Sequence, residues 1–200
     1  NLPADLEFDR VTSVAINNEE NILVLHRGVD PLLEFDAAGN FLRAFGPRDT
    51  WTFSHGLQID NEDNIWVTDA GTHSVMKLDS DGNILMTIGT PGQNGLWNES
   101  TGSHLFDQPN DIAFDSAGNF YIAQGHGQGE PRILKFNSKG DFISQWGSRG
   151  AEPGQFAVAH SIDIDENDQV YVADRENFRV QIFDTEGNFQ DEWTFSAMAC

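Results

Sequence analysis

The amino-acid sequence predicts an all-β fold, a β-propeller of four-stranded blades, with four blades present of an expected six. Three observations predict it: a fourfold internal repeat, short strands rich in β-branched and aromatic residues, and tight turns that contain glycine. No stretch shows the sustained 3.6-residue apolar period of an amphipathic helix. A chain of 200 residues is long enough to bury a core as one propeller body.

The repeat is measured at one apolar position in the first strand of each copy. The four positions are Val14, Leu57, Ile112 and Ile162, at successive spacings of 43, 55 and 50 residues. A unit of this length with four short strands has the size of one blade. We expect an inserted surface loop at 91–107, which explains the long second spacing. The predicted blades are 7–46, 51–90, 108–147 and 155–193.

Within each copy, the elements follow one order. An apolar first strand and an acidic turn precede a second strand, at 21–25, 64–68, 119–123 and 169–173. The third strand leads into a tight turn, at 38–40, 81–83, 139–141 and 186–188. Glycine beside asparagine or aspartate in these turns supplies the positive φ that a short hairpin requires before the fourth strand.

The composition restricts the partners that this protein can have. Eleven basic residues stand against 32 acidic ones, which gives a formal net charge of -21. Such a charge argues against nucleic acid or an anionic membrane surface as a partner. Most of the acidic residues lie in turns such as 60–63 and 163–166, where we interpret them as solvated surface. No apolar run is long enough to span a membrane.

The two ends of the sequence suggest an incomplete ring. The chain starts at Asn1, shows no signal peptide, and has a single cysteine, Cys200, so cysteine usage leaves the compartment unknown. Neither end supplies an obvious strand that would close the first blade onto the last. We therefore expect the remaining blades of the propeller to lie outside this sequence.

A candidate metal site appears at the start of the first strands. The equivalent residues there are Thr12, His55, Asn110 and His160. A repeat fold does not require imidazole in alternate copies, although either histidine alone could simply bond to a nearby loop. In a six-bladed ring, blades 2, 4 and 6 are related by a threefold axis, so three imidazoles there would form an open zinc site. We expect the third histidine about 105 residues after His160, beyond this sequence.

A second set of equivalent positions follows the second strand and contains two arginines. It consists of Arg27, Ala70, Gly125 and Arg175. The planar guanidinium suits a carboxylate, but such an arginine can also pair with an aspartate of the next blade. Of the four histidines outside the first set, we interpret three as structural or solvent-facing: His26, His73 and His104.

These residues resemble a known family. The phrase at 172–180 is similar to NHL-repeat propellers, and longer collinear stretches resemble peptidyl-α-hydroxyglycine α-amidating lyase. The stretches are 11–15, 26–28, 55–60, 66–69, 108–113, 144–147, 153–156 and 160–161. The resemblance implies a channel zinc held by three histidines, of which His55 and His160 match two. It also implies a structural calcium bound partly by the backbone carbonyls of Val14 and Leu57.

The resemblance also implies a reaction and a cellular location. A small-molecule or peptide substrate, peptidyl-α-hydroxyglycine, would be cleaved at its carbon–nitrogen bond into a peptide amide and glyoxylate. Arg27 and Arg175 would lie over the zinc, one near the catalytic base and the other near the substrate. A secreted or periplasmic location is favoured by this resemblance alone.

One residue departs from the family. The tyrosine that serves there as base is replaced by His126, in a loop at 125–131 that is three residues longer than its counterparts in repeats 2 and 4. His126 could act as the base, as a further metal ligand, or as neither. Three functions remain open: a zinc lyase, a non-catalytic NHL propeller that binds protein or peptide, and a calcium-dependent lactonase-type propeller. The last requires a channel cluster of carboxylates and amides, which the first set of positions supplies poorly.

Overall fold

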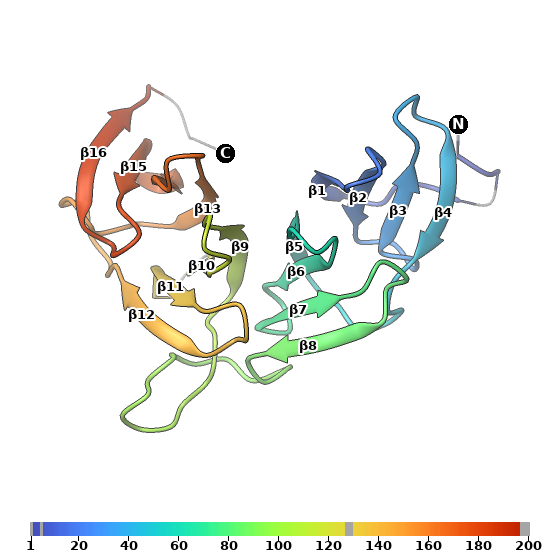
Figure 1. Cartoon of the computed structure of the whole chain (residues 1–200). Helices are drawn as coiled ribbons and strands as arrows, with labels where there is room; N and C mark the ends of the chain where they lie inside the picture. The colour runs from blue at the N-terminus through green and yellow to red at the C-terminus, as the bar shows by residue number, and fades with distance from the viewer. Residues whose placement is uncertain (1, 5, 127–129, 197–200) are drawn as a thin grey trace.

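The computed structural model describes residues 2–4, 6–126 and 130–196, and it confirms the predicted fold class. The chain forms four antiparallel sheets of four strands each, arranged as consecutive blades around a central channel (Figure 1). The first strand of each blade is innermost, and neighbouring first strands pack against each other along the channel. Blades 1 and 4 lie at the two ends of the arc (Figure 1). Cys200 lies outside the described residues.

The strands have the following bounds. Blade 1 contains β1 (Val11–Ile16), β2 (Ile22–His26), β3 (Leu32–Phe35) and β4 (Phe41–Phe45). Blade 2 contains β5 (Ser54–Ile59), β6 (Ile65–Asp69), β7 (Ser74–Leu78) and β8 (Ile84–Ile88). Blade 3 contains β9 (Pro109–Phe114), β10 (Phe120–Gln124), β11 (Arg132–Phe136) and β12 (Phe142–Trp146). Blade 4 contains β13 (Ala159–Ile164), β14 (Val170–Asp174), β15 (Arg179–Phe183) and β16 (Phe189–Thr194), with a short 3₁₀ helix at Arg175–Asn177.

The hydrophobic core is divided among the seams between blades. Blades 2 and 3 share the largest aromatic cluster, where the ring of Phe120 lies 4.7 Å from Trp66 and 5.2 Å from Phe136. Each of these side chains is almost fully buried, which contributes roughly 2–3 kcal/mol apiece from apolar burial. The inserted loop 91–107 joins the same cluster through Trp97 and Phe106. It is therefore anchored to the seam rather than free on the surface.

One end of the molecule, the turn end, carries the two hairpin turns of every blade. In all eight turns, an aspartate or asparagine accepts the backbone N–H groups two and four residues later. The eight acceptors are Asn17, Asp36, Asp60, Asp79, Asp115, Asn137, Asp165 and Asp184. These side chains satisfy donors that the turn would otherwise leave unpaired.

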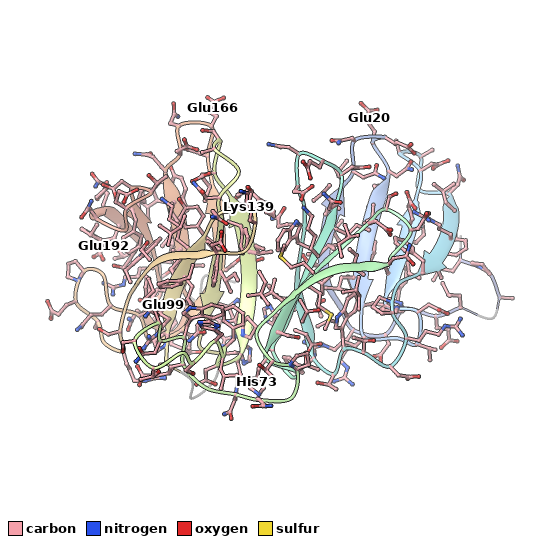
Figure 2. The ribbon with its side chains drawn as sticks, turned by 60° about the horizontal axis from the view of Figure 1, so that its bottom comes forward. Glu20, His73, Glu99, Lys139, Glu166 and Glu192 are labelled. Atoms are coloured by element: carbon pink, nitrogen blue, oxygen red, sulfur yellow. The ribbon has the colours of Figure 1, made fainter. Side chains whose placement is uncertain are left out.

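The opposite end, the histidine end, carries the loops between second and third strands. Figure 2 shows the separation, since Glu20 and Glu166 of two turns lie at one end and His73 lies at the other. These loops differ in length from blade to blade, and among the connections between second and third strands the longest joins β10 to β11. Among the described residues, no helix is long and apolar enough to cross a membrane.

Two polar links fasten blade 3 to blade 4 at the turn end. Lys135 Nζ donates to the carbonyl of Thr185 at 2.8 Å and lies 3.2 Å from the Glu186 carboxylate. Ser116 donates both its backbone N–H and its hydroxyl to Asp168. Each link joins a side chain or turn of one blade to a turn of the next.

The same two links recur between blades 1 and 2, with different residues. Arg43 donates to the carbonyl of Ser80 at 2.7 Å and lies 3.5 Å from Asp81. The backbone N–H of Asn18 donates to the Asp63 carboxylate at 2.9 Å. This seam therefore closes as the seam between blades 3 and 4 does.

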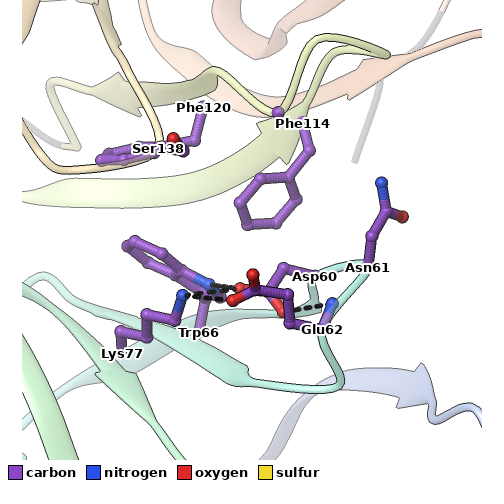
Figure 3. A pocket seen from close by; sticks show the side chains of 9 residues that line it. Asp60, Asn61, Glu62, Trp66, Lys77, Phe114, Phe120 and Ser138 are labelled. Atoms are coloured by element: carbon purple, nitrogen blue, oxygen red, sulfur yellow. Dashed lines mark hydrogen bonds and ion pairs between the residues drawn. The ribbon is translucent and has the colours of Figure 1, made fainter.

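The seam between blades 2 and 3 lacks both links. Gly118 stands where Asp63 and Asp168 stand in the other turns, and Lys139 stands at the acidic position of Asp81 and Glu186. A pocket of about 250 Å³ opens at this place, lined by Asp60, Asn61, Glu62, Trp66, Lys77, Phe114, Gly118, Phe120 and Ser138 (Figure 3).

Lys77 does not cross this seam. Its ammonium pairs with Asp60 of its own blade at 3.0 Å, and Asp60 also accepts the indole N–H of Trp66 at 2.9 Å (Figure 3). Blade 2 therefore satisfies its own buried charges without a partner in blade 3.

Candidate metal centre at the histidine end

A β-bulge directs one side chain of each first strand. The pairing register of the first and second strands shifts where Thr12, His55, Asn110 and His160 stand. A bulge leaves one residue outside the ladder and turns its side chain away from the regular alternation. The set of positions found in the sequence is therefore a set of bulge residues.

Gly56 lets the bulge of blade 2 approach blade 3. A Cβ placed on Gly56 would lie 2.8 Å from the carbonyl oxygen of Asn110 and 2.8 Å from Thr68 Oγ1. The hydroxyl of Thr68 in turn donates to that same carbonyl at 2.7 Å. A larger residue would push β5 away from β9 and displace His55.

His126 reaches the same region from the loop after β10. Gly125 adopts a φ of +108°, which L side chains rarely adopt, and an added Cβ would lie 2.5 Å from Pro131 Cα. Its N–H donates to the carbonyls of Asp107 and Gln108 at 3.1 Å. Glycine is thus required for the turn that brings His126 towards the channel. Residues 127–129 of this loop lie outside the described residues.

Three imidazoles meet at the histidine end. The ring centroid of His55 lies 4.9 Å from that of His160 and 5.4 Å from that of His126, and the last two are 5.7 Å apart. One nitrogen from each ring lies within 4.8 Å of the others, and all three side chains are partly buried. Nitrogens bound to one zinc ion at 2.0–2.1 Å are about 3.3 Å apart, so small side-chain movements would suffice. The donor set fits zinc, which imidazole nitrogen binds well.

The electrostatic surroundings keep these rings neutral. Burial lowers the pKa of His55 and of His160 to about 4, helped by neighbouring histidines and by Arg175. Burial also lowers the pKa of His126, with Arg175 and Arg27 acting in the same direction. Near pH 7 each ring therefore offers a lone pair, which suits either metal binding or proton acceptance.

The two predicted arginines flank this cluster. The guanidinium of Arg27 lies 3.5 Å from the centroid of the Phe53 ring, and its Nε donates to the carbonyl of Ser54 at 3.3 Å. It forms no ion pair within the described ranges, and its pKa is lowered by burial and then by Arg10. Arg175 pairs with Glu176 of its own blade at 3.0 Å. Within the described residues, Arg27 therefore forms no ion pair with an aspartate of blade 2.

Nearby charged residues have structural roles. Asp174, fully buried, accepts backbone N–H groups from Ala157 and Val158 and pairs with Arg179 at 3.0 Å. Asp69 accepts three backbone N–H groups in the equivalent place of blade 2.

The three histidines outside both the first set and the cluster contact neighbouring loops. The ring of His26 bonds to the backbone of Asp9 and Asp30, and His73 accepts the N–H of Gln108. His104 stacks on Trp97. These contacts agree with the predicted structural role of all three residues.

Sequence reasoning named Asn110 only as an equivalent position of the first set, and it missed Asp111. Asn110 donates to the carbonyl of Ala159, while its side-chain oxygen is buried without a partner among the described residues. Asp111 accepts the hydroxyl of Ser161 and the N–H of Ile162, and burial raises its pKa to about 6. Asn110 and Asp111 follow Pro109 in a stretch that predicted only a strand. The one signal of a further role was the presence of two adjacent polar residues in a strand that lines the channel.

The residues predicted to bind calcium lie on two channel strands. Leu57 on β5 is buried at 1% exposure, and Val14 on β1 is 55% exposed. Both pair through regular ladder positions with β6 and β2. Their carbonyls as calcium ligands stay a prediction.

Comparison with known proteins shows that the chain is similar to proteins with NHL repeats. Residues 156–183 match the family model of the NHL repeat. Human NHL repeat-containing protein 3 is 35% identical over 109 residues, which are 53% of this chain and 30% of that protein.

Two further relatives are named for peptide amidation. Peptidyl-glycine alpha-amidating monooxygenase A of Xenopus laevis is 45% identical over 91 residues, 42% of this chain and 10% of that protein. A probable peptidyl-alpha-hydroxyglycine alpha-amidating lyase of Caenorhabditis elegans is 41% identical over 81 residues, 39% of this chain and 23% of that protein. The chain thus spans less than a third of the length of these relatives, and its resemblance to NHL-repeat proteins and amidating lyases is confirmed.

Solved structures agree on the architecture. A streptogramin B lyase superimposes with a TM-score of 0.69 at 14% identity, covering 96% of this chain and 57% of its own. A gluconolactonase from Xanthomonas campestris gives a TM-score of 0.69 at 16% identity, covering 94% and 63%. At such low identity, the likeness shows the propeller fold and nothing of the activity.

Proposed function

We propose that this chain is part of a zinc-dependent lyase that cleaves peptidyl-α-hydroxyglycine into a peptide amide and glyoxylate. The observation that carries the proposal is the meeting of His55, His126 and His160 between Arg27 and Arg175. The similarity to amidating lyases supports the same substrate class.

His55 and His160 would hold the zinc, which supplies a Lewis acid that polarises the substrate hydroxyl. Burial keeps both imidazoles neutral, so no proton has to leave before they bind a metal. A hydrogen bond to the backbone carbonyl of Asn110 orients His55 and leaves its other nitrogen free. A structural calcium at the carbonyls of Val14 and Leu57 is part of the same proposal.

The two arginines would bind and orient the substrate. The product glyoxylate is a carboxylate, and a guanidinium can hold such a group through two parallel hydrogen bonds. Arg27 is the better candidate for this contact, because it forms no ion pair within the described residues and stacks on Phe53. Arg175 carries a second positive charge on the opposite side of the cluster, from blade 4.

The reaction requires one proton acceptor. As the carbon–nitrogen bond breaks, the hydroxyl gives its proton to this acceptor and becomes the aldehyde of glyoxylate. The acceptor then returns the proton to the nitrogen, which leaves as the amide. His126 occupies the position of the tyrosine base in the resemblance. A neutral imidazole there could accept the hydroxyl proton or bind the metal, and the proposed reaction is compatible with either role.

The test uses the longest natural polypeptide that carries this sequence, loaded with zinc. We expect glyoxylate release from a peptidyl-α-hydroxyglycine, and its loss in His55→Ala and His160→Ala while circular dichroism shows an unchanged fold. His73→Ala, which removes a histidine outside the cluster, serves as the control. No release by the zinc-loaded wild type would end the lyase proposal.

The second candidate is a non-catalytic NHL propeller that binds a protein or peptide. It is favoured by the 35% identity to human NHL repeat-containing protein 3, whose name states no reaction. A polypeptide that binds zinc but releases no glyoxylate, and retains peptide binding after His55→Ala, would support this function. The similarity to a gluconolactonase shows the fold alone and does not support a lactonase.

A further inference from the structure

We propose that His126 is a metal ligand, so that blades 2, 3 and 4 of this chain complete a three-histidine site without any further blade. The lyase proposal assigns the zinc to His55 and His160 and leaves His126 as base or ligand, and the third ligand was expected beyond the sequence. The inference concerns metal binding alone, so it stands or falls independently of the reaction.

The geometry of the three rings supports a common ion. His126 is nearly equidistant from its two partners, at 5.4 and 5.7 Å between centroids, and its nearest nitrogen lies within 4.8 Å of theirs. Three neutral nitrogens that converge from three elements leave a fourth position open, which is the arrangement of a catalytic zinc site.

The position of His126 is determined by contacts on both sides. Gly125 fixes the start of the loop through its positive φ and its closeness to Pro131. The imidazole itself meets the Phe53 ring edge to face at 5.8 Å, so blade 2 supports a residue of blade 3.

Charge sets a condition on the bound ion. Arg27 and Arg175 both act on His55 and His126 electrostatically, so a bare divalent cation is disfavoured by two nearby positive charges. We expect the ion to carry an anionic fourth ligand, a hydroxide or a carboxylate. The ligand class is therefore a borderline divalent metal, Zn²⁺ or Co²⁺, together with a small carboxylate.

The experiment measures metal binding by the 200-residue chain itself. Zinc affinity is obtained by competition with a chromogenic chelator, and Co²⁺ substitution reports the coordination geometry through its visible absorption. We expect one ion per chain with a tetrahedral Co²⁺ spectrum. His126→Ala should weaken zinc binding at least about 100-fold. This exceeds the 10–100-fold loss that is typical when a residue that only supports a metal ligand is removed. His55→Ala should have a similar effect.

Two further variants make the result decisive. His126→Cys keeps a metal ligand and should retain one ion with a red-shifted Co²⁺ spectrum, whereas His104→Ala should bind as the wild type does. Circular dichroism shows whether each variant is folded. Equal affinity of the wild type and His126→Ala would overturn the proposal, as would a folded wild-type chain that binds no metal. The metal-binding experiment does not depend on glyoxylate release, so failure of this site and failure of the lyase proposal are distinguishable.

Discussion

The seam between blades 3 and 4 and the seam between blades 2 and 3 have equivalent strands but different closures. At the first seam, Lys135 and Ser116 bond to the next blade, while the second has a pocket instead. The histidine cluster spans this second seam at its other end, through His55 of blade 2 and His126 of blade 3. The two seams therefore differ at the turn end, while at the histidine end the Thr68 hydroxyl bonds to the Asn110 carbonyl across the second seam.

The largest expected effect is stabilisation of the open seam by zinc. At a free zinc concentration of about 1,000 times Kd, binding adds roughly 4 kcal/mol to the free energy of unfolding. Hydrogen exchange should slow most in β5 and β9, which flank this seam, and less in β16. Equal slowing of hydrogen exchange in β16 and β9 would show that zinc does not selectively stabilise the seam between blades 2 and 3. His126→Ala is the matched control, in which the added protection should be lost.

The next effect comes from the links themselves. Lys135→Met should lower the free energy of unfolding by about 2 kcal/mol, because it removes a charge-assisted bond across a buried seam. Lys77→Met should cost less, about 1 kcal/mol, since Lys77 bonds only within blade 2. Chemical denaturation of both variants measures the difference. Equal losses would show that the two seams do not differ energetically.

Acid should weaken the histidine end within a defined pH window. His55 and His160 have folded pKa values near 4, below the unfolded value of about 6.5, so the unfolded chain takes up protons first as pH falls. Stability is therefore complete above pH 6.5 and declines towards pH 4, by about 1–2 kcal/mol after allowance for partial exposure.

Asp111 acts in the opposite direction over part of that window. Its folded pKa near 6 lies above the unfolded value, so its stabilising contribution is lost as pH rises through 6. Asp111→Asn should therefore steepen the acid decline, and the double variant His55→Gln/His160→Gln should flatten it. Thermal melts from pH 4 to 7 follow both trends. If stability declined on acidification as steeply in the double variant as in the wild type, titratable groups other than His55 and His160 would be responsible.

The smallest expected effect is a gain from closing the pocket. Gly118 has a φ of +80°, and the aspartates at the equivalent positions, Asp63 and Asp168, tolerate 65° and 60°. Gly118→Asp should supply the acceptor that Asn61 lacks and raise stability by about 0.5–1 kcal/mol. Gly92→Asp, at a φ of +80° with no neighbour within 4 Å, is the control and should not stabilise. Similar denaturation midpoints for the two variants would rule out the link.

The sequence alone predicted the propeller and the approach of His55 to His160, because both follow from the repeat. Strand periodicity, glycine turns and equivalent positions are local signals, and the fourfold repeat multiplies each of them. Because the same turn motif occurs at all eight hairpins, equivalent residues of the four blades could be aligned accurately from the sequence.

His126 was recognised, but its closeness to both other histidines was not. It lies in a loop outside the repeat, and its path depends on the φ of Gly125 and on contact with Pro131. Sequence periodicity does not predict the position of such a loop residue. The contacts of Asn110 and Asp111 could not be predicted, because they depend on three blades meeting at the channel.

The bulges have a consequence for how this scaffold can acquire new activities. A bulge turns towards the channel whichever side chain stands there, and the ladder on both sides is unaffected by the choice. One substitution per blade, at Thr12 or Asn110 for example, would therefore change the channel chemistry while the sheets keep their pairing. Evolvability in this fold is concentrated at four backbone positions that gene duplication creates together and that later mutation can alter one at a time.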